Sequence, residues 1–343
     1  MQHTINMKDN EIITLSHGSG GKLTNNLIKK LFLKKFNNPK LQPLEDAAIL
    51  NISGSYLAFT TDTFTVDPLF FPGGDIGKLA ICGTINDLAV MGAKPLYLSC
   101  GMVIEEGLKL DTLKKIVDSM RKMAEATGIE IVTGDTKVVE KGKGDKIFIN
   151  TSGIGIFGEG IKPLENNFQP GDKIIINGTI GDHGIAVLSA RQEFGFETDI
   201  VSDSAPLNGL VSEILPIAPG IRFMRDPTRG GLATTLNEIV EGKDFGILID
   251  EEKIPIRESV KGICEILGFD PLYVANEGKV VLIVDQKDAN RVLEKMRTHP
   301  LGKESRIIGK VVSEPIERVC LKTRAGGTRI VDMMVGEQLP RIC

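Results

Sequence analysis

A strand, a loop rich in proline and glycine, and an apolar helix are predicted in succession between residues 58 and 91, and this stretch constrains the fold most. The run 58–61 ends on the acid Asp62. The loop covers 68–77, and residues 76–91 then place apolar side chains at the i, i+3, i+4 spacing of a half-buried helix. The pattern predicts a fold that mixes strands with helices.

Two acids of this stretch, Asp62 after the strand and Asp87 on the helix, are expected to face each other. Gly83 lies one helical turn before Asp87, so bare backbone is predicted beside that carboxylate. Carboxylates in this arrangement can bind a hard divalent cation and, through it, a polyphosphate. A strand, loop and helix whose glycines only form turns is the other interpretation, and the spacing alone does not choose between them.

Length and charge limit the classes of protein to consider. A chain of 343 residues is long enough for about two domains. The net charge is −4, there is no basic block and Trp is absent, so nucleic acid is not an expected partner. No apolar run approaches the roughly 18 residues of a membrane span, and the polar N-terminus does not resemble a signal peptide.

The five cysteines are widely spaced and form no Cys-x-x-Cys pair. This distribution argues against a zinc or disulfide framework and for a reducing compartment. We therefore expect a cytoplasmic protein.

The N-terminal region carries a glycine-rich segment, residues 16–22, which ends in Lys22. Its bare amides could approach a phosphate, with Lys22 adding positive charge, although the pattern is not a Walker motif. A flexible glycine linker is the alternative. An amphipathic helix is predicted over 22–36, with Leu31 and Phe36 among its inward-facing residues.

Residues 45–49 and 56–61 flank a Ser-Gly-Ser turn and predict a hairpin. Its two arms would place Asp46 and Asp62 near each other at one end. A solvated turn acid is the alternative for Asp46.

The rest of the first half predicts alternating strands and helices around a second informative loop. That loop is Gly134-Asp135-Thr136-Lys137, and a charged hairpin tip is expected after it. The expected strands are 96–105, 129–133 and 147–157, with a helix over 110–127 closed by Gly128. Residues 158–171 give the strongest linker signal. We therefore predict an N-terminal domain over 1–160, a C-terminal domain over 161–335 and a mobile tail over 336–343.

The second half repeats the mixture of strands and helices, so two α+β domains are expected. Asp182 is interpreted as a helix N-cap, and His183 as structural or exposed, with substrate contact as the alternative. Asp226 precedes a glycine pair at a helix N-terminus, which is either an anion site or an ordinary cap. Glu277 lies in a tight turn and, taken alone, is expected to be solvated.

The chain ends on a cysteine, Cys343, which follows Pro340. A thiol on a mobile tail suits a covalent carrier, because a tether raises the effective concentration of its cargo. The alternative is an inert, frayed terminus. The thiol is not a prenylation signal, since such a signal needs three residues after the cysteine.

Several blocks of the chain together resemble the PurM-like ATP-dependent synthetases, and the closing Pro340-Arg-Ile-Cys343 narrows the resemblance to the hydrogenase maturation family. The resemblance spans essentially the whole chain. The blocks are Glu45-Asp-Ala-Ala-Ile, Thr61-Asp-Thr-Phe-Thr-Val, Gly83-Thr-Ile-Asn-Asp-Leu-Ala-Val-Met-Gly-Ala93, Gly134-Asp-Thr-Lys137, Asp226-Pro-Thr-Arg-Gly-Gly and Asn276-Glu-Gly-Lys.

The resemblance implies an ATP-dependent dehydratase that makes the cyanide ligands of the nickel–iron hydrogenase centre. The thiol of Cys343 would receive a carbamoyl group from the carbamoyltransferase HypF. ATP would phosphorylate the carboxamide oxygen, and loss of phosphate would leave a protein thiocyanate whose cyanide passes to the HypC–HypD complex. The resemblance also implies a homodimer in which the N-terminal domains pair through strands, together with a C-terminal α/β sandwich domain.

The motif matches imply a role for each site residue. Cys343 is the carrier, Glu277 the candidate base, and Lys137 the group that binds the amide oxygen or phosphate. The Mg²⁺ ligands are Asp46, Asp87 and Asp226, a set without thiol or imidazole that suits a hard cation. The nucleotide contacts are Lys22, Asp46, Asp62, Thr63, Thr84, Asn86, Asp87, Gly134, Asp135 and Thr136.

Other activities of the superfamily fit less well. Selenophosphate synthetases usually carry Cys or selenocysteine in the glycine loop, where this chain has Ser19. The purine cycloligase and the thiamine phosphate kinase give no reason for a terminal thiol. A non-catalytic adaptor whose tail only docks on HypC–HypD is the alternative from a different class of protein. Several separate acids and a glycine loop argue against it, since an adaptor needs no site for metal and phosphate.

Overall fold

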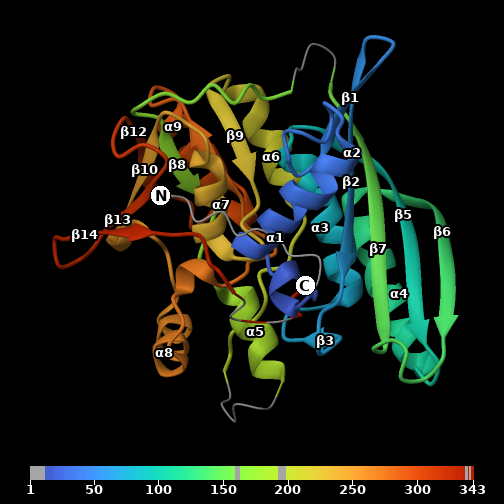
Figure 1. Ribbon diagram of the computed structural model, residues 1–343. Helices are drawn as coiled ribbons and strands as arrows, with labels where there is room; N and C mark the ends of the chain where they lie inside the picture. Colours follow the sequence, from blue (N-terminus) through green and yellow to red (C-terminus); the bar gives the residue numbers. More distant parts are fainter. Residues whose placement is uncertain (1–11, 159–162, 192–197, 337–338, 340) are drawn as a thin grey trace.

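The structure, a computed structural model, describes residues 12–158, 163–191, 198–336, 339 and 341–343. Two β-sheets lie on opposite sides of the molecule, and the C-terminus lies between them (Figure 1). The five-stranded sheet is built by the first half of the chain and the seven-stranded sheet by the second half. The expected mixture of strands and helices in both halves is confirmed.

The five-stranded sheet has the strand order β1-β2-β7-β5-β6. The predicted hairpin is confirmed by antiparallel pairing of β1 with β2, with Ala48 opposite Phe59. β6 pairs with β5 in parallel and forms the edge of the sheet. The strands are β1 Ala48–Ile52, β2 Ser55–Phe64, β5 Lys94–Glu105, β6 Glu130–Val139 and β7 Ile147–Ile156, and the short β3 Phe70–Phe71 pairs with β4 Gly74–Asp75.

Two helices, α3 (Ile76–Val90) and α4 (Leu110–Thr127), accompany this sheet. The prediction that α3 is half-buried is wrong, because nearly all of its residues are buried between the sheet and the second domain. Apolar residues fill more than one face of this helix, which is typical of a helix inside a core. α4 is amphipathic and ends at Gly128, which has the expected left-handed conformation with φ 69°.

Two predicted boundaries in this half are wrong. β2 does not end at Asp62 but continues to Phe64, because residues 57–64 all pair with β7. The segment 134–137 is not a loop but the middle of β6, paired with residues 100–103 of β5. Gly134 permits this pairing because a β-carbon there would overlap the carbonyl oxygen of Cys100.

The first helical segment runs over residues 22–36 as predicted, but its middle is a π-helix. Leu31 is 40% exposed and Phe36 is 66% exposed, so the prediction that they face inward is wrong. The wider π turn changes the rotation per residue and so moves these side chains off the buried face. The segment comprises α1 Lys22–Leu27, the π-helix Ile28–Leu33 and α2 Lys34–Phe36, and the 3-10 turn Leu15–Gly18 precedes it.

The seven-stranded sheet has the order β14-β13-β10-β12-β8-β11-β9 and is covered on both faces. Residues of α7 pack on one face, and residues of α6 and α9 pack on the other. All four residues of β11 are buried, as this double cover requires. The strands are β8 Lys173–Ile176, β9 Ile221–Arg225, β10 Gly246–Asp250, β11 Val281–Val284, β12 Arg306–Val312, β13 Val319–Lys322 and β14 Thr328–Val331. The helices are α5 Asp182–Ala190, α6 Asn208–Ile214, α7 Gly231–Val240, α8 Glu258–Leu267 and α9 Ala289–Thr298, and short 3-10 turns lie at 215–217, 251–253, 271–273 and 300–302.

The end of the chain packs into the core between the domains. Leu339 and Ile342 are buried in a cluster that also contains Ile76 and Ile185. None of the helices in the described ranges has both the length and the hydropathy needed to cross a bilayer. The predicted boundary at 160 lies among residues 159–162, outside the described residues, as do 337–338 and 340 of the predicted tail.

Candidate active site

The last three residues of the chain are bound through their backbone carbonyl groups. The amide and hydroxyl of Thr65 donate to the carbonyl oxygen of Cys343 at 3.0 and 3.2 Å. The amide of Asp67 donates to the carbonyl oxygen of Arg341 at 3.1 Å. Nε2 of His183 lies 2.8 Å from the carbonyl oxygen of Ile342. These contacts fix the backbone of the chain end, and the side chain of Arg341 adds a hydrogen bond of 3.0 Å to the carbonyl oxygen of Thr65 and an ion pair with Asp145.

This binding places the thiol of Cys343 beside Glu277 of the same chain. Burial raises the pKa of the Cys343 thiol, Arg229 lowers it, and the charges of Glu277 and Asp62, with a hydrogen bond to Glu277, raise it again. The residue is half-buried and packs against the core between the domains. The thiol is therefore held in its protonated form beside a carboxyl group.

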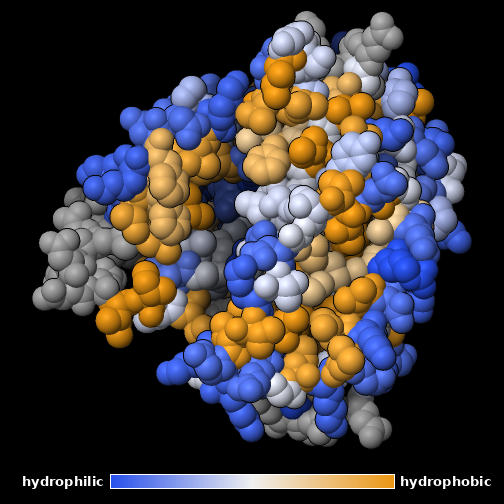
Figure 2. Space-filling view, turned by 90° about the vertical axis from the view of Figure 1, so that its right-hand side faces the viewer, coloured by the Kyte–Doolittle hydropathy of each residue, from blue (hydrophilic) through white to orange (hydrophobic). Residues whose placement is uncertain are grey.

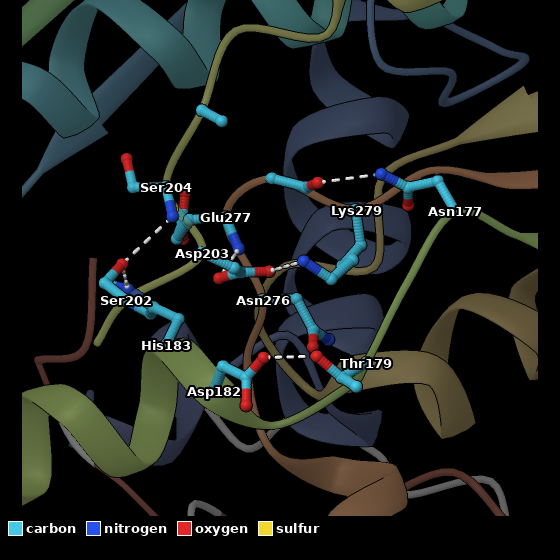
Figure 3. A network of polar contacts seen from close by, with 12 residues as sticks. Asn177, Thr179, Asp182, His183, Ser202, Asp203, Ser204, Asn276, Glu277 and Lys279 are labelled. Atoms are coloured by element: carbon cyan, nitrogen blue, oxygen red, sulfur yellow. Dashed lines mark hydrogen bonds and ion pairs between the residues drawn. The ribbon is translucent and has the colours of Figure 1, made fainter. Parts of the chain in front are cut away.

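The backbone around Glu277 is fixed on both sides. Its amide donates to Oδ1 of Asp203 at 3.1 Å, and the side-chain amide of Asn86 donates to its carbonyl oxygen at 3.3 Å. Asp203 also forms a buried ion pair of 2.9 Å with Lys279 (Figure 3). The turn that presents Glu277 is therefore rigid.

The side chain of Glu277 is buried, being 3% exposed, so the prediction of a solvated turn residue is wrong. Within the described part of the chain, its Oε1 atom has no hydrogen-bond partner. Burial raises the pKa of Glu277 well above its ordinary value, Asp62 and Asp226 raise it further, and Arg229 opposes them. A raised pKa makes a carboxylate a stronger proton acceptor than an ordinary glutamate.

Four acids predicted for the site form one electrostatic cluster. Burial raises the pKa of Asp87 well above its ordinary value, and Asp226, Asp62 and Asp46 add to the rise. Burial likewise raises the pKa of Asp226, with contributions from Asp46 and Asp62. The hydroxyl of Thr60 lies 2.7 Å from the carbonyl oxygen of Asp46 and 2.8 Å from Oδ2 of Asp87, which joins the hairpin to α3. The expected proximity of Asp46 and Asp62 agrees with this arrangement.

The cluster does not by itself form a complete set of metal ligands. Among the residues that the structure describes, no three His, Cys, Asp or Glu side chains converge as metal ligands do. Asp46 is engaged by Arg225, whose Nε lies 3.1 Å from its Oδ1. The pKa values of Asp87 and Asp226 stay raised because burial and the neighbouring acids outweigh Arg225, which lowers the pKa of Asp226. These two carboxylates have the charge and the hard oxygen donors that Mg²⁺ takes in combination with phosphate oxygens.

The predicted phosphate loop, residues 16–22, contacts the base of the tail. The amide of Lys22 donates to the carbonyl oxygen of Met334 at 2.8 Å, and a β-carbon at Gly21 would overlap the same oxygen. Nη1 of Arg229 donates to the carbonyl oxygen of Gly18 at 2.7 Å. Nζ of Lys22 lies 3.3 Å from Asp332, on the surface. In this structure the glycine-rich segment therefore packs against the start of the tail.

The remaining predicted nucleotide contacts are engaged within the protein. Thr84 is fully buried and its hydroxyl lies 2.5 Å from that of Thr151. Asn86 joins α3 to the second domain through Glu277 and through Leu207, whose amide donates to it at 2.8 Å. Thr63 accepts a hydrogen bond of 2.9 Å from Asn150 on the neighbouring strand.

Asp135, Thr136 and Lys137 lie away from these groups, on the exposed edge strand β6. Lys137 pairs with Asp135 at 2.9 Å, and both side chains are more than two-thirds exposed. The hydrogen bond and charge of Lys137 lower the pKa of Asp135. The structure thus divides the predicted site into an exposed edge strand and a group of neighbouring side chains between the domains, called the cleft below, which comprises Asp46, Asp62, Asp87, Asp226, Glu277 and Cys343.

Comparison with known proteins identifies the family. The family described as AIR synthase related protein matches with its N-terminal domain over residues 44–157 and with its C-terminal domain over 169–322. Carbamoyl dehydratase HypE of Cupriavidus necator is 50% identical over 343 residues, covering 100% of this chain and 97% of the relative. The chain belongs to the carbamoyl dehydratase HypE family.

Solved HypE structures have the same fold. A HypE–HypF complex matches with a TM-score of 0.85 at 52% identity, covering 90% of this chain and 99% of that chain. HypE in complex with ATP matches with a TM-score of 0.80 at 47% identity, covering 97% and 100%. The resemblance to the PurM-like hydrogenase maturation family and the two-domain α+β fold are therefore confirmed.

Sequence reasoning missed two residues of the cleft in this HypE family chain. Arg229 belongs to the motif that begins at Asp226, and no role of its own was predicted for it. In the structure it is the cation with the largest effect on the pKa of Cys343. His183 was expected to be structural, exposed or in contact with substrate, and it is buried against the tail. The N-cap interpretation of Asp182 is wrong, because Gly181 is the N-cap and Asp182 contacts Thr179 and Arg257 instead.

Proposed function

We propose that this chain is the ATP-dependent dehydratase that converts a carbamoyl group on Cys343 into a thiocyanate, as a source of cyanide for the iron of a nickel–iron hydrogenase. The observation that carries the proposal is the position of the terminal thiol beside Glu277, in a cleft of acids from both domains. A frayed and inert terminus would not have every carbonyl group of residues 341–343 bound. The names of the relatives agree with this function.

The reaction removes one oxygen and two protons from the carbamoyl group. The γ-phosphoryl group of ATP is transferred to the carboxamide oxygen, which turns a poor leaving group into phosphate and divides a difficult elimination into two easier steps. The two protons leave the nitrogen, the C–O bond breaks, and S–C≡N, ADP and phosphate remain. Glu277 is the proposed base, because its raised pKa and its position beside the sulfur suit proton removal from the attached amide.

The reaction also needs a positive charge near the carboxamide oxygen. The sequence motifs assign this role to Lys137, whereas Arg229 is the cation that acts on Cys343, Glu277 and Asp62 within one chain. We assign the charge in the cleft to Arg229 and keep Lys137 as a contribution from the partner subunit of a homodimer. That assignment explains why β6 carries site residues on an exposed edge.

Mg²⁺ is assigned to Asp87 and Asp226, with Asp46 as a third ligand if Arg225 releases it. When bound, the ion would shield the triphosphate during phosphoryl transfer. The proposed nucleotide contacts remain Lys22, Asp62, Thr63, Thr84, Asn86 and the segment 134–136.

The edge strand β6 and the outer face of its sheet are the proposed homodimer surface. Val132 and Val138 on β6 are 58% and 67% exposed, and Tyr97 on β5 is 45% exposed. Apolar patches separated by polar residues cover this side of the molecule (Figure 2). An edge strand with exposed apolar side chains is the kind of surface that pairs with another chain.

HypF is the proposed donor of the carbamoyl group, since a solved relative forms a HypE–HypF complex. HypC–HypD is the proposed acceptor of the cyanide. The location of these reactions is predicted to be the cytoplasm. The domain limits at 160 and 335 also stay predictions.

The deciding experiment follows the mass of the intact protein after incubation with HypF, carbamoyl phosphate and ATP. The wild type is expected to gain one carbamoyl group and then to lose 18 Da, the mass of water calculated from this reaction, with matching ADP release. Cys343→Ala is expected to fold and bind nucleotide but to gain no mass. A normal mass gain in Cys343→Ala contradicts the carrier role, and the absence of ADP release that depends on the carbamoylated tail favours the adaptor.

A further inference from the structure

His183 connects the reactive end of the chain to the scaffold that carries Glu277. It is the second residue of α5 and is fully buried. Its Nε2 atom lies 2.8 Å from the carbonyl oxygen of Ile342, the residue before Cys343. Its Nδ1 atom lies 2.8 Å from the hydroxyl of Ser202 (Figure 3). Neither the motif matches nor the chemistry proposed above gives this residue a role.

The partners of the ring determine which nitrogen carries the proton. A carbonyl oxygen can only accept, so Nε2 of His183 is the donor to Ile342. Nδ1 of the neutral ring then accepts from the hydroxyl of Ser202. Burial lowers the pKa of His183, which keeps the ring neutral as this arrangement requires. The hydroxyl of Ser202 in turn accepts from the amide of Ser204 at 3.0 Å.

The segment that fixes the ring also fixes the proposed base. Asp203 lies between Ser202 and Ser204, and its carboxylate accepts from the amide of Glu277. Its ion pair with Lys279 anchors it in the second domain. One short segment, 202–204, therefore sets the position of the tail through His183 and the position of Glu277 through Asp203.

The orientation of the ring is restricted on its other side. Phe71 of β3 packs edge-on against His183, with ring centroids 5.5 Å apart and an interplanar angle of 85°. A buried ring that is packed by an aromatic side chain and bonded at both nitrogens has one accessible orientation. Its Nε2–H group therefore points to one place, which the carbonyl group of Ile342 occupies.

We propose that His183 is a positioning residue, which binds the backbone of Ile342 and so sets the distance between the cargo on Cys343 and Glu277. The consequence for catalysis rests on the function proposed above, whereas the contact itself does not. When the tail leaves the cleft to receive a carbamoyl group, His183 loses its acceptor, and the hydrogen bond favours return of the tail to this position.

Two substitutions at His183 distinguish the roles of its two ring nitrogens. The amide of Gln can replace Nε2 and that of Asn can replace Nδ1, so His183→Gln retains the tail contact and His183→Asn retains only the Ser202 contact. We expect iodoacetamide to modify Cys343 about tenfold faster in His183→Asn, the effect of about one lost hydrogen bond. The rate in His183→Gln should stay within about twofold of the wild type. His299→Asn, at a histidine that contacts Leu301 instead, is the control and should leave the rate unchanged.

The same variants test the effect on the reaction. With carbamoylated protein and ATP, His183→Asn should lose water about tenfold more slowly than His183→Gln, while HypF modifies both at the wild-type rate. Equal alkylation rates in the two variants overturn the proposal. If even the carbamoylated wild type does not lose water, the proposed function fails. The difference in the alkylation rate of Cys343 between His183→Asn and His183→Gln then still decides the role of His183.

A measurement on the wild type decides the question if His183→Asn does not fold. The chain has four histidines, so ¹⁵N labelling of histidine resolves the ring of His183 by NMR. We expect the neutral tautomer with the proton on Nε2, and a shift of that resonance when residues 339–343 are removed. The proposal is overturned if the proton is on Nδ1, or if the Nε2 resonance does not shift when residues 339–343 are removed.

Discussion

The cleft around Cys343 and the edge strand β6 carry the same kinds of charged residue in opposite electrostatic states. In the cleft, burial and neighbouring acids raise the pKa values of Asp87 and Glu277. On β6, the hydrogen bond from Lys137 lowers the pKa of Asp135, and water surrounds both side chains. The cleft therefore contains excess negative charge that a cation or a proton would relieve, whereas the pair on β6 is already neutralised.

This contrast indicates which residues can act within one subunit. An acid with a raised pKa in a buried site is suited to bind Mg²⁺ or to exchange a proton. A solvated and paired acid acquires such a role only if another surface covers it. The predictions below test this division, beginning with the largest expected effect.

Glu277→Gln should abolish dehydration and leave carbamoyl transfer intact. The substitution removes the proposed base but keeps the size of the side chain, and loss of a general base costs roughly 10²- to 10⁴-fold in rate. The rate of water loss from carbamoylated protein is the measurement. Glu258→Gln, at an exposed acid on α8 that pairs with the neighbouring Lys261, is the control and should behave as wild type. A rate within a few-fold of wild type for Glu277→Gln would remove this residue from the mechanism.

Lys137→Met should also be inactive, but its defect should be complemented by a second inactive subunit. If β6 completes the cleft of the partner, a heterodimer of Lys137→Met with Glu277→Gln contains one intact site. Random mixing makes half of all dimers heterodimers with one intact site of two, so about a quarter of the wild-type activity should return. This fraction is an order-of-magnitude expectation for a symmetric dimer. Mixtures that stay inactive would place Lys137 outside the partner's site.

Gly21→Ala should weaken the binding of the tail without unfolding the protein. An added β-carbon overlaps the carbonyl oxygen of Met334, a backbone atom that cannot move aside as a side chain can. Gly18→Ala is the matched control in the same loop, since among the described residues, its chain neighbours aside, no atom lies within 4 Å of its added β-carbon. We expect Cys343 to be alkylated about tenfold faster in Gly21→Ala, the effect of losing about one hydrogen bond. Equal rates in the two variants would show that the loop does not support the tail.

Local patterns predicted the fold better than they predicted the cleft. The hairpin β1–β2, the helices α3 and α4 and the left-handed Gly128 follow from turn residues and apolar spacing. The segment 134–137 was misread because glycine and acid residues usually mark loops, while here the close approach of Cys100 requires the glycine within a strand. Such an approach depends on residues distant in sequence.

The dependence on contacts between residues distant in sequence also explains which cleft residues were missed. The sequence pointed to Cys343 because it is the last residue, to Asp87 because of its position on a predicted helix, and to Glu277 because it lies in a family motif. The sequence did not point to His183, because its partners Ser202 and Ile342 lie 19 and 159 residues away. The burial of Glu277 was unpredictable for the same reason, since the residues that cover it come from both domains.

Asp87→Asn and Asp135→Asn should change the pH dependence of stability in opposite directions. The pKa of Asp87 is raised in the folded protein, so its contribution is present below pH 3.8 and is lost as the pH rises through the folded value. Asp87→Asn cannot ionise, so without Mg²⁺ it should become more stable than wild type above about pH 4. The pKa of Asp135 is lowered, so its contribution is present above pH 3.8 and is lost as the pH falls through the folded value. Asp135→Asn should therefore be less stable than wild type at neutral pH and equal to it in acid.

Urea midpoints measured between pH 4 and 8, with and without Mg²⁺, test both signs. Mg²⁺ should stabilise the wild type more than Asp87→Asn, because the substitution removes one of the two carboxylates proposed to bind the ion in the folded protein. Asp135→Asn should respond to Mg²⁺ as wild type does. If Asp87→Asn is destabilised throughout this range, a cation already balances the cleft acids, and the contrast between cleft and edge strand is lost. If both variants shift in the same direction, burial rather than charge pairing determines the electrostatics of both regions.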